Sequence, residues 1–327
     1  MNNLKKIGLT ALAASLVSTS VFAGEVTVGG SASMTVDGYT GESLNAGKGF
    51  SMGNQLTFTG GGELDNGLTV GISFVLDQGD NETDTTAGAG TAPFDSHSVS
   101  ISSDTLGTLT MHGEGGSNAA SALDTSAAGD IWDSFDNVAE TTGAIVKGAT
   151  SGADILVYNL PAIVDGLSMS ASYSPQQAAA AASMAYGLTY TGVEGLTVSY
   201  GMGDAETGVS STEADQTVMS ASYAYGSFTI AYSENDYASA VAASDQEMTS
   251  YKLSYTVSDE ISVSYGSEEI TLEGDTDTAE FDKISASYTS GGMTVTAGLS
   301  ESANGAHDST SNIDDRDYWS LGLSFAF

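Results

Sequence analysis

Cysteine is absent from the 327 residues, which excludes disulfide frameworks and thiolate metal sites. Histidine occurs only three times, and no two histidines have the His-x-x-x-His spacing of a helical zinc site. The sequence also contains no P-loop and no Gly-x-Ser-x-Gly nucleophile elbow. Because these motifs are missing, we expect the chain not to be an enzyme.

Basic residues are scarce, since seven Lys and Arg stand against 42 Asp and Glu, a formal net charge of −35. Such a surface repels nucleic acid and attracts cations, so nucleic acid is excluded as a partner. Proline occurs three times and glycine 40 times, which favours strands joined by turns over a proline-rich coil. The acids lie between alternating apolar runs, which indicates a folded chain despite its charge.

Long apolar runs are also rare. The clearest run, 7–17, follows two lysines and is too short for a transmembrane helix, which needs about 20 residues. A small-x-small pattern ends at Ala23. These features predict a cleaved secretory signal peptide at 1–23, followed by a mature domain at 24–327.

Alternation with a period of two is the dominant pattern in the rest of the chain. In the last eleven residues, large apolar side chains occupy the odd positions Trp319, Leu321, Leu323, Phe325 and Phe327. Small or weakly polar residues lie between them, so one strand face is large and apolar. A closed transmembrane barrel can turn this face to lipid and leave no unpaired strand edge.

Sixteen such segments are predicted as strands. They are 25–36, 50–60, 68–76, 96–104, 107–114, 153–160, 167–174, 182–191, 195–203, 215–225, 227–235, 248–258, 260–267, 280–290, 292–300 and 317–327. The connections alternate between short turns and long polar loops. An even strand number with this alternation is the plan of an antiparallel transmembrane β-barrel.

Eight tyrosines support the same register, because all of them are predicted on the apolar face. Four precede short turns and four follow them by five to seven residues: Tyr190, Tyr225, Tyr255 and Tyr288, and Tyr173, Tyr200, Tyr232 and Tyr265. On a barrel they would form two rings, as expected of aromatic girdles at the membrane interfaces.

With its terminal Phe327, the last strand resembles that of Gram-negative porins, and the whole pattern is similar to general diffusion porins of the alphaproteobacterial, Rhodobacter type. The resemblance implies a bacterial outer-membrane location, contact with membrane lipid and lipopolysaccharide, and a homotrimer. It also implies that the barrel assembly machinery recognises the C-terminal strand. In similar porins the third loop folds into the lumen, and here that position is the stretch 115–152.

The predicted constriction loop is acidic. It carries Asp124, Asp130, Asp133, Asp136 and Glu140, opposed only by Lys147. Similar porins place a cluster of basic residues on the facing wall, but the first four strands here offer none. By strand parity the lumen-facing lysines are Lys252 and Lys283, on late strands. An excess of fixed negative charge in a narrow lumen predicts a preference for cations.

Two further groups of side chains are candidates for chemistry. His112 is predicted to line the pore near Glu114, where such a pair could belong to a rim hydrolase or serve only as polar lining. Two acidic clusters offer oxygen ligands for weak binding of Ca²⁺ as a cofactor. They are Asp77, Asp80, Glu82 and Asp84, and Asp314, Asp315 and Asp317.

The sequence therefore predicts an all-β, sixteen-stranded antiparallel transmembrane barrel with an inward-folded third loop, acting in passive diffusion of small hydrophilic solutes. Three alternatives stay open. A substrate-selective porin would place a row of aromatic residues in the lumen. A surface receptor or adhesin would have a plugged barrel, and a secreted β-protein would dissolve without detergent.

Overall fold

The computed structural model describes most of the chain between residues 26 and 327. The described residues are 26–40, 48–77, 95–136, 154–175, 182–205, 214–239, 245–275, 277–305, 307 and 316–327. The predicted signal peptide lies outside them. Among the described residues there is no helix with the length and apolarity to cross a membrane.

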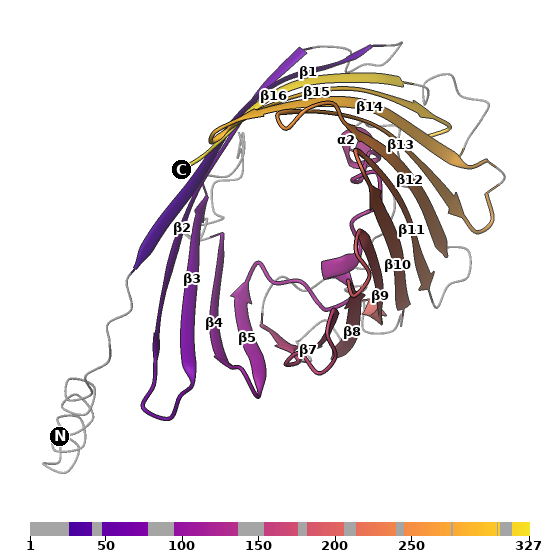
Figure 1. The fold of residues 1–327 in the computed structure, drawn as a ribbon. Coiled ribbons are helices and arrows are strands. Elements are labelled where there is room, and N and C mark those ends of the chain that lie inside the picture. Colours follow the sequence, from indigo (N-terminus) through magenta and orange to yellow (C-terminus); the bar gives the residue numbers. More distant parts are fainter. Residues whose placement is uncertain are drawn as a thin grey trace, which may run out of the picture.

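The described chain forms one closed antiparallel barrel of sixteen strands, seen along its axis in Figure 1. The strands are β1 (Thr27–Thr40), β2 (Lys48–Glu63), β3 (Thr69–Asp77), β4 (Ser96–Ser103), β5 (Gly107–Glu114), β6 (Ile155–Asn159), β7 (Leu167–Ser174), β8 (Ser183–Tyr190), β9 (Leu196–Ala205), β10 (Ala214–Tyr225), β11 (Phe228–Ser239), β12 (Gln246–Thr256), β13 (Ile261–Leu272), β14 (Ala279–Ser290), β15 (Met293–Ala303) and β16 (Arg316–Ala326). Two short helical turns, η1 (Ser121–Leu123) and α2 (Asp133–Asp136), lie between β5 and β6. The predicted number, order and antiparallel arrangement of the strands are confirmed.

Pairing of the first and last strands closes the sheet. β1 and β16 pair from Ser31 opposite Ala326 to Thr40 opposite Asp317. Beyond the last pair, the Gly30 N–H donates to the Phe327 carbonyl at 2.8 Å, and the Phe327 N–H donates to the Gly30 carbonyl at 3.0 Å. Every strand therefore has two neighbours, and no sheet edge is left unpaired.

The two faces of the barrel follow the alternation in the sequence. On β16 the odd residues, such as Leu321 and Phe325, lie on the outer face and are exposed. On β12 the even residues lie on the lumen side, where Ser250 is completely buried, while Tyr251 on the outer face is half-exposed. Large apolar side chains thus cover the outside, and small hydroxyl side chains line much of the inside.

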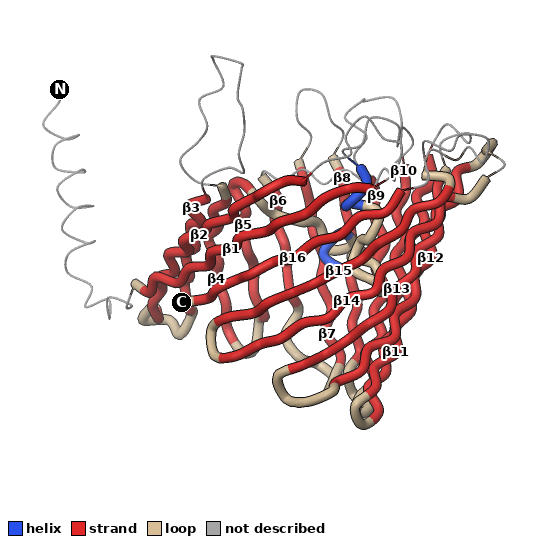
Figure 2. The backbone as a smooth tube through the Cα atoms, turned by 90° about the horizontal axis from the view of Figure 1, so that it is seen from above, coloured by secondary structure: helices blue, strands red, loops and turns tan. Residues whose placement is uncertain are grey.

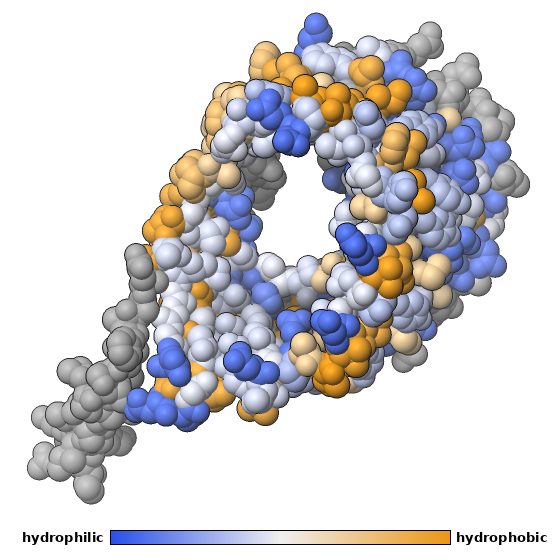
Figure 3. Space-filling view, viewed as in Figure 1, coloured by the Kyte–Doolittle hydropathy of each residue, from blue (hydrophilic) through white to orange (hydrophobic). Residues whose placement is uncertain are grey.

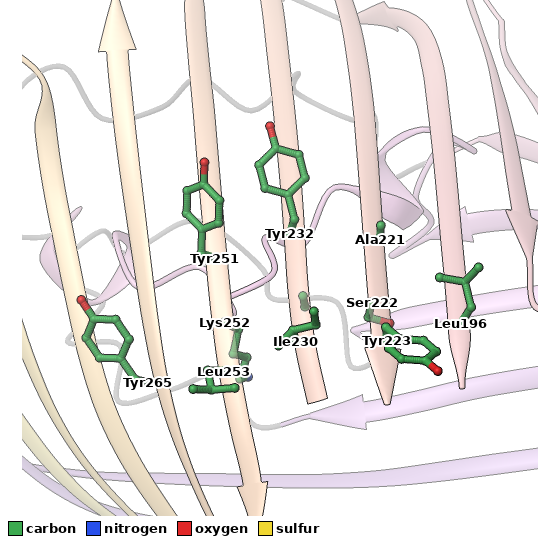
Figure 4. Close-up of a pocket in the computed structure, with 11 residues that line it drawn as sticks. Leu196, Ala221, Ser222, Tyr223, Ile230, Tyr232, Tyr251, Lys252, Leu253 and Tyr265 are labelled. Carbon is green, nitrogen blue, oxygen red and sulfur yellow. The ribbon is translucent and has the colours of Figure 1, made fainter. Parts of the chain in front are cut away.

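Tyrosines gather on the outer face, as the sequence predicts. Figure 4 shows Tyr232 and Tyr251 side by side on β11 and β12, with Tyr265 on β13, and all three line a groove of about 430 Å³. The rings of Tyr232 and Tyr251 lie 5.2 Å apart between centroids. Amphipathic rings on the outer face of a barrel are expected near a membrane–water interface.

Connections at one end of the barrel are short, and two of them consist of only two residues, 226–227 and 291–292. Gly226 and Gly291 begin these turns with φ of 59° and 58°, a conformation that glycine adopts without steric cost. At the other end the chain between strands is longer, above all between β5 and β6. This end is called the long-loop end below, and the opposite one the short-turn end.

Strand length varies around the barrel. β3 to β8 have 5–9 residues each, with β6 the shortest. The other strands, from β9 through β16 to β1 and β2, have 10–16 residues. The side view in Figure 2 shows strongly tilted strands whose ends do not lie in one plane. The wall is consequently higher on one side of the barrel than on the other.

Candidate solute passage and its constriction loop

Residues 115–136, called the constriction loop below, turn from the end of β5 into the barrel. In Figure 1 this segment and α2 lie on the lumen side of β8 to β13. Gly115 starts the turn with φ of 69°, and a Cβ atom there would lie 2.2 Å from the Ser96 Cβ atom. Only glycine fits so close to β4 in this conformation.

The first part of the loop packs on β7 to β9 through small residues. A Cβ atom at Gly201 would lie 3.0 Å from the Ala120 Cα atom, and one at Gly187 would lie 2.7 Å from the Ala119 carbonyl oxygen. The Ala119 N–H donates to the Ser172 hydroxyl at 2.9 Å. Glycine on the wall and alanine on the loop therefore allow the two backbones to approach closely.

The middle of the loop is bound through hydroxyl groups on the wall. The Ala127 N–H donates to the Ser233 hydroxyl at 2.8 Å, and the Ala128 N–H donates to the Ser250 hydroxyl at 2.9 Å. Both serines are buried beneath the loop. Since a buried N–H needs a partner, these contacts satisfy loop backbone that no strand pairs with.

Glu268 is the most deeply buried acidic residue of this interface, with 0% exposure. Its Oε2 atom accepts the Trp132 N–H at 3.1 Å, and its Oε1 atom accepts a hydrogen bond from the Ser126 hydroxyl. A buried carboxyl group is costly unless its oxygens are hydrogen-bonded. Glu268 on β13 thus holds two points of the loop, six residues apart.

An apolar cluster anchors the end of the loop. Ile131 and Phe135 are completely buried. They pack with Ala128, Met248, Ile270, Ala279 and Phe281. The Phe135 and Phe281 ring centroids are 5.6 Å apart, and the Tyr39 hydroxyl on β1 donates to the Ser134 carbonyl. The loop therefore spans the inside of the wall from β5 to β1.

Sequence reasoning missed the wall residues of this anchor, although a signal was present. Met248, Ile270 and Phe281 all fall on the lumen face of their strands, where the neighbouring residues are small or polar. Large apolar residues on a lumen face indicate that another segment of the chain packs on the inner wall there. Reading that signal would have located the end of the loop.

The predicted loop acids lie in different environments. The Asp124 carboxylate accepts the Gln216 side-chain N–H at 3.3 Å, and Asp130 Oδ1 accepts the Ser126 N–H at 3.0 Å. Asp133 is exposed at the start of α2. Asp136 ends that helix, but its side chain lies outside the described residues. Glu140 and Lys147 also lie outside them.

Two predicted wall residues, Lys252 and Lys283, lie on the lumen side of β12 and β14, next to the loop. His112 lies on the lumen face of β5, opposite Ser98. A β-bulge then shifts the register, and exposed Glu114 pairs with His97. The bulge therefore lies between the pair Ser98–His112 and the pair His97–Glu114, so His112 and Glu114 do not follow each other in regular alternation along β5.

Of the two predicted Ca²⁺ clusters, only Asp77 and Asp317 are described, and both are exposed. The other members lie outside the described residues: Asp80, Glu82, Asp84, Asp314 and Asp315. A cluster that the sequence did not suggest lies on β11 and β12, where carboxylate oxygens of Glu234, Asp236 and Glu247 are within 4.8 Å of one another. Strand pairing brings these acids together, and no local spacing marks them.

An open passage remains beside the constriction loop. The space-filling view along the barrel in Figure 3 shows a hole bounded mainly by hydrophilic and neutral residues. The loop occupies one side of the lumen, and the wall around β1 to β5 forms the other side (Figure 1). This geometry suits the movement of hydrated solutes through the barrel, since polar groups line a continuous path.

Known proteins share this architecture. The family model for Gram-negative porins matches residues 8–282. No curated protein matches the chain. Two mutants of the Rh. blastica porin are similar in structure, each with a TM-score of 0.66, at 16% and 15% identity, and each similarity covers 93% of this chain and 100% of the mutant.

A porin of Comamonas acidovorans described as anion-selective is similar at a TM-score of 0.67 and 16% identity, covering 93% of this chain and 99% of that one. At such identities the solved structures establish the fold alone. The family match extends over most of the sequence and agrees with the closed sixteen-stranded barrel. The chain belongs to the Gram-negative porin family.

Proposed function

We propose that this chain is a general diffusion porin that lets small hydrophilic solutes and ions cross the outer membrane passively. The observation that carries the proposal is a hydrogen-bonded loop held against the inner wall of an open barrel. A loop fixed in this way narrows the lumen to a set size without closing it. Solutes are then sorted by size at the loop and by charge along the wall.

Cation preference is the finer part of this proposal. Asp124, Asp130 and Asp133 are the loop acids whose side chains are described, and the chain as a whole carries 42 acidic against seven basic residues. At physiological salt, charges act over about 8 Å, so acids on the loop weigh more than acids on distant loops. Anion selectivity, which describes the Comamonas acidovorans porin, is the opposite expectation.

The reversal potential of the purified protein across a tenfold KCl gradient tests this function. Stepwise conductance with a potential drawn toward the K⁺ equilibrium value of about 59 mV is expected. Asp133→Asn should move the potential toward zero, whereas Glu269→Gln, on the exposed outer face, should leave it unchanged. Steps with anion preference would overturn the charge assignment, and a correctly folded barrel without steps would overturn the channel.

The proposal also covers export, assembly and partners. A signal peptide at 1–23 would be removed, leaving the barrel at 24–327, and the assembly machinery would recognise the strand that ends in Phe327. The mature barrel would form a homotrimer and contact lipid and lipopolysaccharide. Conduction itself needs no cofactor, and Ca²⁺ at the acidic clusters would be weak and accessory. N-terminal sequencing and chemical cross-linking of purified outer membranes test the cleavage and the trimer.

A further inference from the structure

Below the constriction loop, toward the short-turn end, the wall of β12 to β16 is almost uniformly hydroxylated. A cavity of about 450 Å³ lies there, bounded above by Ala128 and Gly129 of the loop. Seven hydroxyl side chains line it: Ser254, Ser262, Ser264, Ser285, Ser287, Thr296 and Ser320. The cavity's charged lining residues are Lys252 and Lys283.

Strand register places these two lysines on either side of a glycine. Lys252 on β12 pairs with Gly266 on β13, and Gly266 pairs with Lys283 on β14. Neighbouring strands are about 4.8 Å apart, so the two lysine Cα atoms are separated by about 10 Å. Gly266 itself places no side chain between the two lysines.

The constriction loop sits directly on this glycine. A Cβ atom at Gly266 would lie 2.7 Å from the Ala128 Cβ atom. Lys283 extends along the wall, where its Cε atom lies 3.4 Å from the Cβ position of Gly298. Two glycines thus make room for the loop and for one lysine stem. Both lysines thus line the cavity whose upper boundary is the constriction loop.

Neither lysine has a carboxylate partner in the described part of the chain. The acid in the adjacent lumen-facing row, Glu268, is engaged with Ser126 and Trp132 of the loop. Other strand acids nearby, such as Asp282 on β14, lie on the outer face, where Asp282 accepts the Tyr265 hydroxyl at 2.6 Å. Two free positive charges therefore face a water-accessible cavity lined by hydrogen-bond donors.

We propose that Lys252 and Lys283 form a binding site for small phosphate-bearing anions just below the constriction loop. A phosphate group carries close to two negative charges and offers several acceptor oxygens, which suits two ammonium groups and surrounding hydroxyls. The site rests on the proposed channel function and refines it. Most of the lumen would favour cations, while the site at Lys252 and Lys283 would bind phosphorylated solutes that pass the loop.

Single-channel recording in KCl tests the site, with inorganic phosphate as the probe. Phosphate is expected to reduce the KCl current of the unmodified protein in a saturable manner. In the double variant Lys252→Gln/Lys283→Gln, the half-blocking concentration should rise about tenfold or more, because both charge-assisted contacts are lost. The single variants should lie between these values.

Lys48→Gln is the matched control, because Lys48 lies on the outer face with its Nζ atom 5.9 Å from the Trp319 ring centroid. Phosphate should block the current through Lys48→Gln at the same concentration as in the unmodified protein. If phosphate leaves the current unchanged, or blocks the double variant and the parent equally, the proposed anion site is refuted. The proposed channel function would not be affected by that result. Absence of any conducting steps from the parent would instead overturn the proposed function. To verify that each variant is folded, heated and unheated samples are compared on gels, and the shift in mobility should equal that of the parent.

Discussion

At the scale of single residues, Glu268 illustrates how a polar lumen is adapted to hold a loop. Glu268 has the parity of a lumen-facing residue on β13, but the predicted strand ended at 267, one residue before it. Its partners could not be predicted, because Ser126 is 142 residues away in the chain. Folding alone brings the two side chains together, and no local spacing records the contact.

Replacing Glu268 by Ala should loosen the constriction loop. The Trp132 N–H and the Ser126 hydroxyl would lose their acceptor in a buried place, which typically costs about 1–3 kcal/mol. We expect single-channel current to become noisier and to visit additional levels. Glu269→Ala is the control, since Glu269 is the next residue but is exposed on the outer face. Equally quiet currents from both variants would refute the role of Glu268.

The loop acids show a second limit of sequence reasoning at this scale. Counting charges treats all acids alike, but Asp124 accepts a hydrogen bond from Gln216 on the wall and Asp130 accepts one from Ser126 within the loop, whereas Asp133 is exposed. The sequence alone does not distinguish an acid that organises the loop from one that faces the passage. Hydrogen-bond partners make that distinction, and the partner of Asp124 lies 92 residues away on β10.

At the scale of elements, the constriction loop is fitted to the wall by size. Its position after the fifth strand was predicted from resemblance, whereas the wall residues that bury Phe135 were not predicted. The path over Gly187, Gly201 and Gly266 was not predicted, because glycine in a strand sequence has several meanings. Here these glycines mark the track on which the loop lies.

Gly266→Val should push the loop away from β13. The new side chain would overlap Ala128, and overpacking of this kind typically costs about 1–3 kcal/mol. Displacement into the passage should lower the conductance of each open channel. Ser254→Val adds the same side chain to the lumen wall below the loop and should change conductance less. An unchanged conductance in Gly266→Val would contradict the described packing.

At the scale of the whole molecule, the strand pattern was sufficient to predict the barrel. Boundaries differ mainly where strands continue past the apolar region, as in β13, which was predicted at 260–267 and ends at Leu272. Backbone pairing continues there, although the outer side chains become polar. The hydropathy of a strand depends on what surrounds its side chains, whereas strand pairing depends on backbone hydrogen bonds. The end of the apolar pattern and the end of the paired strand therefore need not coincide.

Closure by the last residue gives a prediction at this scale. Deletion of Phe327 would remove two backbone hydrogen bonds to Gly30, whereas Phe327→Ala would keep both. After refolding in detergent, without any assembly machinery, the deletion should unfold at a lower temperature than the alanine variant. The transition is followed by heat-modified mobility on gels. Equal unfolding temperatures would show that these bonds do not contribute to barrel stability.

The unequal height of the wall has a consequence for the surrounding membrane. An eight-residue strand tilted by about 40° rises about 20 Å, whereas the apolar band of such barrels is about 25 Å tall. Lipid beside β3 to β8 must therefore compress, and that beside β10 to β13 need not. Each ångström of mismatch costs a fraction of a kcal/mol. Elastic strain in the bilayer would then draw the low sides of neighbouring barrels together, since a copy placed there replaces the compressed lipid.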